Sequence, residues 1–249
     1  MDQYNVKKYF LYKTITDDRA KLYSLFKLGH VSSVDRISKD MAVFISKTLF
    51  LPNNENVFIY TTHKIPIDNA CKKSSLLLSE NISKFFKLPI VIGEYYHVFN
   101  DVEFYNNKKT FRKTDIKIPF FEENKILKKK KINIIVIDDS FVTGDSLQES
   151  LRKLFQITKN ITFFSIIKLK GEKKLELDLN EYIFKNNSYN ILPKIVMESG
   201  YRFTTQMLRV INDLPLLELG RFINKIDSYQ RKELKRGFKN FFGRSLQIN

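Results

Sequence analysis

The residues with the clearest chemical potential lie just past the middle of this 249-residue sequence. An apolar run ends in Asp138 and Asp139, and Thr143, Gly144 and Ser146 follow closely. Glycine lets a backbone approach a ligand closely, and the N–H groups at the start of a helix bind anions such as phosphate. Two carboxylates would repel a phosphate, so they are better suited to hydroxyl groups or a hydrated Mg²⁺. Together these residues predict a site for a ribose 5-phosphate.

The elements around this turn should place it at one edge of a parallel sheet. The run 132–137 is almost entirely apolar, as expected for a central strand that is covered on both faces. A helix is predicted over about 145–155 and a further strand over 161–167. Ligands of open α/β sheets bind at the carboxyl ends of strands. We therefore expect both acids to lie at a strand end outside the core, where replacing both by asparagine would leave the fold intact.

An earlier part of the chain has the pattern of a strand-helix-strand unit. Strand formers occupy 57–60, a polar loop follows over 61–73, and a helix is predicted over 74–86. A second strand is predicted over 88–92, ended by Gly93. Such a unit predicts parallel pairing with a right-handed crossover.

The whole chain, 1–249, is expected to form one domain with three parts. Residues 1–56 are predicted as a helical N-terminal piece whose second helix begins at Ser38 or Asp40. Residues 57–185 are predicted as the α/β core, and 186–249 as a helical C-terminal extension. Within the core, 94–131 has no clear period and is predicted to be a long hairpin or a mobile loop, which is often functional.

The segment around the two acids resembles the phosphoribosyl pyrophosphate (PRPP) signature of the type I phosphoribosyltransferases. That signature has four apolar residues, two acids and three variable residues before Thr-Gly-x-Ser/Thr, and every fixed position is met here. The layout over roughly 55–185 is also similar, which implies a Rossmann-like, phosphoribosyltransferase-like parallel sheet. The implied activity is transfer of ribose 5-phosphate from PRPP to a nitrogen of a base-like acceptor, with release of pyrophosphate and a role in nucleotide metabolism. The resemblance implies that Asp138 and Asp139 hold the ribose hydroxyls and reach Mg²⁺ through water, and that the 5-phosphate is bound by Val142, Thr143, Gly144, Asp145 and Ser146.

Two loops of the family have counterparts here. The resemblance places the pyrophosphate loop at 61–73 and a flexible loop at about 94–130. The residues assigned to the first are Thr62, Lys64, Lys72 and Lys73, and the cations assigned to the second are Lys108, Lys109, Arg112 and Lys113. Asn69 and Cys71 to Lys73 also loosely resemble the competence-associated ComF-like branch. Val142 stands where the 6-oxopurine branch has an acid, which disfavours a hypoxanthine-guanine enzyme and leaves the acceptor base open.

The net charge of +16 favours polyanionic partners without choosing among them, and the lysine-rich composition is also typical of an AT-rich genome. A second hypothesis is therefore a non-catalytic, PRPP-sensing regulator that binds nucleic acid. Its contact would be the predicted basic helix 229–244. We also expect a homodimer.

The remaining features bear on where the protein works and on an alternative fold. The single cysteine, Cys71, excludes an internal disulfide and a cysteine-based zinc site. No apolar run is long enough to cross a bilayer and the start lacks a signal-peptide core, so a cytoplasmic protein without membrane contact is expected. His63 and His97 are predicted to be loop or surface residues. A response-regulator receiver domain beginning at 132 is a rival, but it needs a phosphoacceptor at a strand end, and Asp178 lacks the expected turn.

Overall fold

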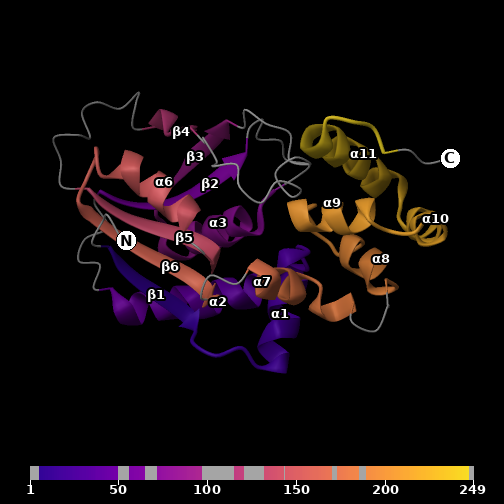
Figure 1. The fold of residues 1–249 in the computed structure, drawn as a ribbon, viewed down its shortest axis with the longest axis horizontal. Helices are drawn as coiled ribbons and strands as arrows, with labels where there is room; N and C mark the ends of the chain where they lie inside the picture. Colours follow the sequence, from indigo (N-terminus) through magenta and orange to yellow (C-terminus); the bar gives the residue numbers. More distant parts are fainter. Residues whose placement is uncertain are drawn as a thin grey trace.

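The computed structural model describes residues 6–49, 56–64, 72–96, 115–120, 132–142, 144–169, 173–184 and 189–246. Within these residues the chain forms a six-stranded sheet in the order β1-β6-β5-β2-β3-β4 (Figure 1). All neighbouring strands pair in parallel except β3 and β4. This confirms the predicted α/β fold class. The strands are β1 (Lys7–Tyr12), β2 (Val57–Lys64), β3 (Ile90–Tyr96), β4 (Asp115–Lys117), β5 (Asn133–Phe141) and β6 (Asn160–Lys168).

Helices cover both faces of the sheet, and a further group of helices lies to one side of it (Figure 1). The first group comprises α1 (Asp17–Lys27), α2 (Val31–Thr48), α3 (Ser74–Phe86), α6 (Asp145–Leu154) and α7 (Lys173–Asn180). The second group comprises α8 (Ile191–Val196), α9 (Thr205–Asn212), α10 (Leu216–Lys225) and α11 (Ser228–Phe242), after a 3₁₀ turn at Tyr182–Phe184. The helical C-terminal extension is confirmed, while the domain boundaries at 56 and 185 stay predictions.

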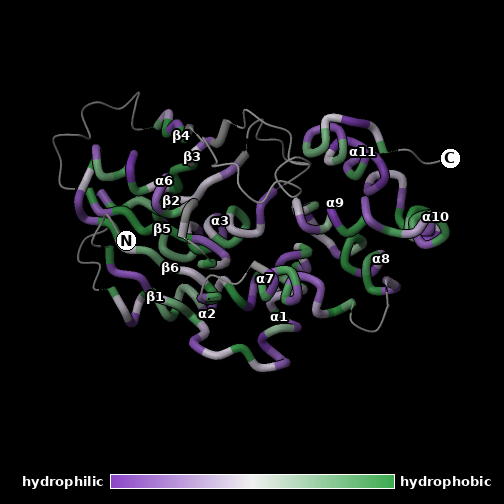
Figure 2. The backbone as a smooth tube through the Cα atoms, viewed as in Figure 1, coloured by the Kyte–Doolittle hydropathy of each residue, from purple (hydrophilic) through white to green (hydrophobic). Residues whose placement is uncertain are grey.

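Strand alternation in β5 separates two layers of core, because successive side chains of a strand point to opposite faces. Ile135 and Ile137 pack in one buried cluster with residues of α1, α2 and α3. Ile134 and Val136 pack in another with Leu147 and other residues of α6. The central strands are largely hydrophobic in Figure 2, as expected for strands buried on both sides.

The N-terminal piece departs from the prediction in two ways. It contains a strand, β1, which pairs in parallel with β6 at the sheet edge. The sequence KKYFLY has no helical period and is rich in strand formers. The prediction missed this strand because two helical segments follow it directly. The second helix begins at Val31, where the His30 side chain accepts the Ser33 N–H, and not at Ser38 or Asp40.

Strands β2 and β3 are both longer than predicted. β2 continues through Lys64, so the first residues of the predicted polar loop belong to the sheet. β3 continues through Gly93 to Tyr96. Gly93 does not end the strand; a Cβ there would lie 2.8 Å from Cζ of Tyr60, so glycine makes room for the tyrosine ring.

The segment 94–131 is described only in part. Its β4 strand pairs antiparallel with β3, as the hairpin alternative predicts, and 97–114 and 121–131 lie outside the described residues. The receiver alternative is not supported, because β2 and β3 belong to the same sheet as β5. Asp178 lies within α7 and not at a strand end.

Candidate functional site

The direction of chain progression across the sheet reverses between β2 and β5. After β2 the chain moves outward through α3 to β3, and after β5 it moves the other way through α6 to β6. The pairing of β2 with β5 ends at Tyr60 and Val136, although the strands continue to Lys64 and Phe141. In open α/β sheets, ligands bind outside the carboxyl ends of strands at such a reversal. The ends of β2 and β5, with the first turns of α3 and α6, therefore form the candidate site.

Asp138 and Asp139 lie at this edge but have different surroundings. Asp139 follows the alternation of Ile135 and Ile137, so it faces the side of the sheet covered by α1, α2 and α3. It is only 9% exposed. The expectation that both acids lie outside the core is wrong for Asp139, because residues far away in the sequence close over it.

Two side chains donate hydrogen bonds to the Asp139 carboxylate. Lys27 Nζ, in the last turn of α1, and Ser74 Oγ, at the start of α3, each lie 2.8 Å from Oδ2. Lys27 Nζ also lies 4.0 Å from Oε1 of Glu176, which accepts a hydrogen bond from Ser140 Oγ at 2.7 Å. Asp139 is thus one part of a buried polar network that draws on α1, α3, β5 and α7.

The charges of this network shift the pKa values of its members. Burial lowers the pKa of Lys27, but the charges of Asp139, Tyr23 and Glu176 and the hydrogen bond to Asp139 together outweigh burial and hold the pKa above the ordinary lysine range. Burial alone would raise the pKa of Asp139, and the Lys27 charge with the hydrogen bonds from Lys27 and Ser74 lowers it below the usual value. Lys27 and Asp139 are therefore both charged at neutral pH.

Asp138 lies near charged groups of both signs, since Asp139, Lys73 and Lys27 all act on it through their charges. It is half-buried, and its Oδ1 accepts the backbone N–H of Asp139 at 2.9 Å. Burial and then the Asp139 charge raise its pKa to about 7, against the opposing effect of Lys73 and Lys27. A carboxylate in this situation gains from an incoming hydroxyl donor or cation.

The start of α6 has the geometry predicted for phosphate binding. Gly144 is its N-cap with φ +84°, a left-handed conformation that favours glycine. A Cβ at this position would also lie 2.9 Å from Cζ of Phe141. Val142 is half-buried and packs against the α2 and α3 side of the core. Thr143 and the side chains of Asp145 and Ser146 lie outside the described residues.

The helices that begin at the reversal differ from most others in the described chain. Side chains of Thr16, His30, Thr204 and Asp227 accept backbone N–H groups at the starts of α1, α2, α9 and α11. No such side-chain bond is present at the start of α3 or α6, nor at α8 or α10. For α3 and α6 this leaves N–H groups of the first turn directed at the candidate site, where an anion can accept from them.

The predicted pyrophosphate residues are only partly brought together. Thr62 is half-buried near the end of β2, and Lys73 is the N-cap of α3. Lys72 pairs with Glu80 of α3 at 2.5 Å, and its backbone N–H donates to Phe203. The side chain of Lys64 and all of Lys108, Lys109, Arg112 and Lys113 lie outside the described residues.

His63 is not the loop or surface residue that was predicted. It is a strand residue of β2, 2% exposed, and burial followed by the charges of Lys73 and Lys72 lowers its pKa to about 4. Its Nδ1 and the Oγ1 of Thr61 have no hydrogen-bond partner in the described structure. His97 lies outside the described residues.

Comparisons with known proteins give distant structural likenesses only. No family model matches the chain, and no curated protein matches it. The purine phosphoribosyltransferase of Pyrococcus horikoshii Ot3 is 12% identical with a TM-score of 0.32, over 55% of this chain and 83% of that protein. A hypoxanthine phosphoribosyltransferase from Staphylococcus aureus is 12% identical with a TM-score of 0.33, over 55% and 61%. That of Trypanosoma cruzi is 9% identical with a TM-score of 0.32, over 61% and 67%.

The chain thus spans about three fifths of the Staphylococcus aureus protein and most of the Pyrococcus horikoshii one. Likenesses this distant carry no argument about the activity of the chain. The ComF-like assignment stays a prediction. In the described part of the chain, no helix is long and apolar enough to cross a membrane, and no three His, Cys, Asp or Glu residues gather as a metal-binding group.

Proposed function

We propose that this protein is a phosphoribosyltransferase that transfers ribose 5-phosphate from PRPP to a nitrogen of a base-like acceptor. The observation that carries the proposal is the arrangement at the reversal between β2 and β5. There, two helix starts that no described side chain caps flank Asp138, a half-buried carboxylate. A phosphorylated sugar needs both kinds of group, since its phosphates seek N–H donors and its hydroxyls seek acceptors.

Each part of PRPP has a suitable partner in this arrangement. The N–H groups at the start of α6 would hold the 5-phosphate, and Gly144 lets the backbone come close to it. Asp138 would accept hydrogen bonds from the ribose hydroxyls. The start of α3, together with Lys73, would hold the pyrophosphate. As the bond from the ribosyl carbon to pyrophosphate breaks and the bond to the acceptor nitrogen forms, these residues act by positioning and charge stabilisation.

Magnesium fits this site as a companion of the pyrophosphate. Mg²⁺ is commonly bound by one or two carboxylates and substrate phosphates while it retains several waters. Asp138 provides one such carboxylate and would contact the ion through water, whereas Asp139 is engaged by Lys27 and Ser74. When bound, Mg²⁺ would neutralise charge on the departing pyrophosphate.

Calorimetric titration with PRPP and Mg²⁺, followed by assays of pyrophosphate release with a panel of bases, tests the proposal. We expect PRPP to bind and at least one base to trigger release of pyrophosphate. Asp138→Asn should abolish release. Asp178→Asn in α7 is the matched control, because it makes the same change at an exposed residue. A parent protein that does not bind PRPP would refute the assignment.

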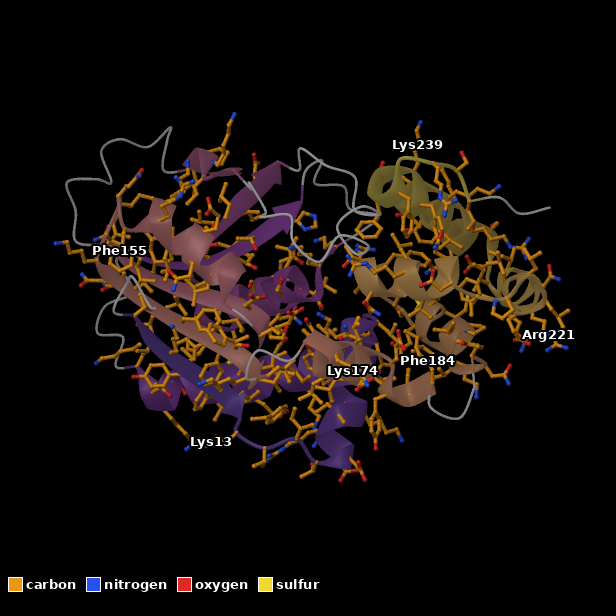
Figure 3. All side chains as sticks on the ribbon, viewed as in Figure 1. Lys13, Phe155, Lys174, Phe184, Arg221 and Lys239 are labelled. Carbon is orange, nitrogen blue, oxygen red and sulfur yellow. The ribbon has the colours of Figure 1, made fainter. Side chains whose placement is uncertain are left out.

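A second candidate, a PRPP-sensing regulator that binds nucleic acid, is favoured by α11. Its exposed side carries Lys232, Lys235, Arg236 and Lys239. In Figure 3, Lys239 points outward on the side of the molecule away from α6. A stripe of cations on one helix face matches the phosphate backbone of a nucleic acid.

Fluorescence anisotropy with duplex DNA and with RNA at two salt concentrations tests this candidate. Replacing Lys232, Lys235 and Lys239 by glutamine should weaken binding and reduce its salt dependence. The matched control replaces the exposed Lys39, Lys84 and Lys87 by glutamine. Nucleic-acid binding with no pyrophosphate release for any base would favour the regulator over the enzyme. Equal loss in both triple variants would assign the binding to net charge alone.

A further inference from the structure

The turn between α1 and α2 is held by a segment of the C-terminal extension. Thr204 Oγ1 donates to the carbonyl of Lys27 at 2.7 Å, and Tyr201 Oη donates to the carbonyl of Leu28 at 2.9 Å. The backbone N–H of Val31 donates to Oε2 of Glu198 at 2.7 Å. Residues some 170 positions away in the sequence thus fix the end of α1.

The end of α1 in turn places Lys27 beside the acid pair. The Lys27 side chain is 12% exposed and ends 2.8 Å from Asp139 Oδ2. Ser74 Oγ donates to the same oxygen, and Ser140 Oγ lies 3.4 Å from Oδ1. Because the Ser140 hydroxyl donates its proton to Glu176, the donors that hold Asp139 are Lys27 and Ser74, both on Oδ2, and Lys27 also balances its charge within the protein.

This arrangement answers an electrostatic problem of the proposed site. Two ionised carboxylates on consecutive residues would both repel the phosphate groups of an anionic sugar phosphate. The interaction of two unit charges 4 Å apart is about 4 kcal/mol at an effective dielectric constant of 20. The strand sends the two side chains to opposite faces, and Lys27 pairs with Asp139, the one on the face covered by α1, α2 and α3. One carboxylate, Asp138, is left for the ligand.

We propose that Lys27 is a positioning residue of the ribosyl site. It binds Asp139 inside the protein, and so makes Asp138 the one acid of the pair that contacts the ribose hydroxyls. The inference rests on the proposed function, and it narrows that function by separating the roles of the two acids. It also makes the N-terminal helix and the segment from Glu198 to Thr204 part of the site's support.

The test compares the binding of ribose 5-phosphate with that of 2-deoxyribose 5-phosphate by calorimetry, because the two differ in one hydroxyl. The parent should prefer ribose 5-phosphate by about tenfold or more, which corresponds to ~1.4 kcal/mol. Asp138→Asn should remove this preference. Lys27→Met should weaken ribose 5-phosphate binding at least about tenfold, because it leaves Asp139 charged and without its cation.

The double variant Lys27→Met with Asp139→Asn tests whether Lys27 acts on the site through Asp139. It removes both charges together, so ribose 5-phosphate binding and the preference for it should return to within about threefold of the parent. Lys39→Met is the control for net charge, since Lys39 is exposed and pairs with Asp35 away from the site. Urea unfolding of each variant establishes that it is folded under the binding conditions, and the double variant gives a result even if Lys27→Met does not fold.

Each other outcome has a definite meaning. If the double variant binds as weakly as Lys27→Met, then Lys27 or Asp139 contacts the ligand directly, and the inference is wrong. Tighter binding by Lys27→Met than by the parent would make Lys27 a blocking group, which also overturns it. If the parent binds neither sugar phosphate nor PRPP, both proposals fall, whereas binding by the parent without recovery in the double variant overturns this inference alone.

Discussion

The sharpest prediction concerns stability, because the two neighbouring acids should respond in opposite ways to the same substitution. Asp139→Asn removes the anion from a pair whose members are 12% and 13% exposed at 2.8 Å. The gross attraction at that distance is roughly 6 kcal/mol at an effective dielectric constant of 20. Asparagine still accepts the Ser74 hydrogen bond, but Lys27 keeps a buried charge whose next carboxylate, Glu176, is 4.0 Å away. We expect a loss of about 3 kcal/mol in the free energy of unfolding, near the lower end for broken buried pairs.

Asp138→Asn should leave the free energy of unfolding unchanged or raise it. Burial and the Asp139 charge raise the folded-state pKa of Asp138 from 3.8 to about 7. A raised carboxyl pKa means that stability falls as the pH rises from the unfolded-state pKa through the folded-state pKa. The variant removes that fall, so any gain should be present at pH 8 and absent at pH 4.

Urea unfolding followed by circular dichroism at pH 8 measures both effects, with Asp178→Asn as the exposed control. The order of stability should be Asp138→Asn at or above the parent, then the control, and Asp139→Asn clearly lowest. Equal destabilisation by the two site variants, or none from Asp139→Asn, would refute the assignment of Asp139 to a buried ion pair.

Three further predictions follow from local geometry. Gly144→Val should weaken PRPP and ribose 5-phosphate binding together, because φ is +84° and the new Cβ would meet Phe141; loss of PRPP binding alone would place the 5-phosphate elsewhere. Gly93→Ala should cost about 1–3 kcal/mol in urea unfolding because its Cβ would press on the Tyr60 ring, and an unchanged midpoint would contradict that contact. Burial, reinforced by nearby lysines, lowers the pKa of His63 from 6.5 to about 4, so the free energy of unfolding should fall as the pH drops through this window. His63→Gln should remove up to about 3 kcal/mol of that fall, and identical stability-versus-pH profiles for parent and variant would contradict this.

The core of the sheet could be predicted from the sequence because its signals are local. The apolar run before Asp138 and the helical period after Gly144 both identify elements that the structure confirms as β5 and α6. The ends of the strands were harder to predict, since Thr61 to Lys64 is polar and has the composition of a loop. These residues are in a strand because β2 pairs with β3 along this stretch, a contact that no local pattern reveals.

The support of the candidate site could not be predicted, because it depends on contacts between distant parts of the chain. Lys27 ends an amphipathic helix, where lysine is common for reasons of helix polarity alone. The packing of α1 against α2 and α7, with the hydrogen bonds from Tyr201 and Thr204, brings it to Asp139. The position of Ser74 could have been predicted more easily. A serine at the start of a helix that follows a strand of the same sheet lies at the sheet edge where the two acids are found.

The strand period explains why a pair of acids serves this site better than a single one would. Because successive side chains alternate, the chain can place one carboxylate toward a ligand and the next toward its own helices. The inward acid binds Lys27, which ties β5 to α1, and α1 is tied to the C-terminal extension through Thr204. Burial and the charge of Asp139 raise the pKa of the outward acid, so a donor or cation on a ligand would stabilise its charged form. Exchanging the roles would require a one-residue shift of β5, which would also turn Ile135 and Ile137 out of their cluster. The hydrophobic register of β5 therefore fixes which acid faces the ligand.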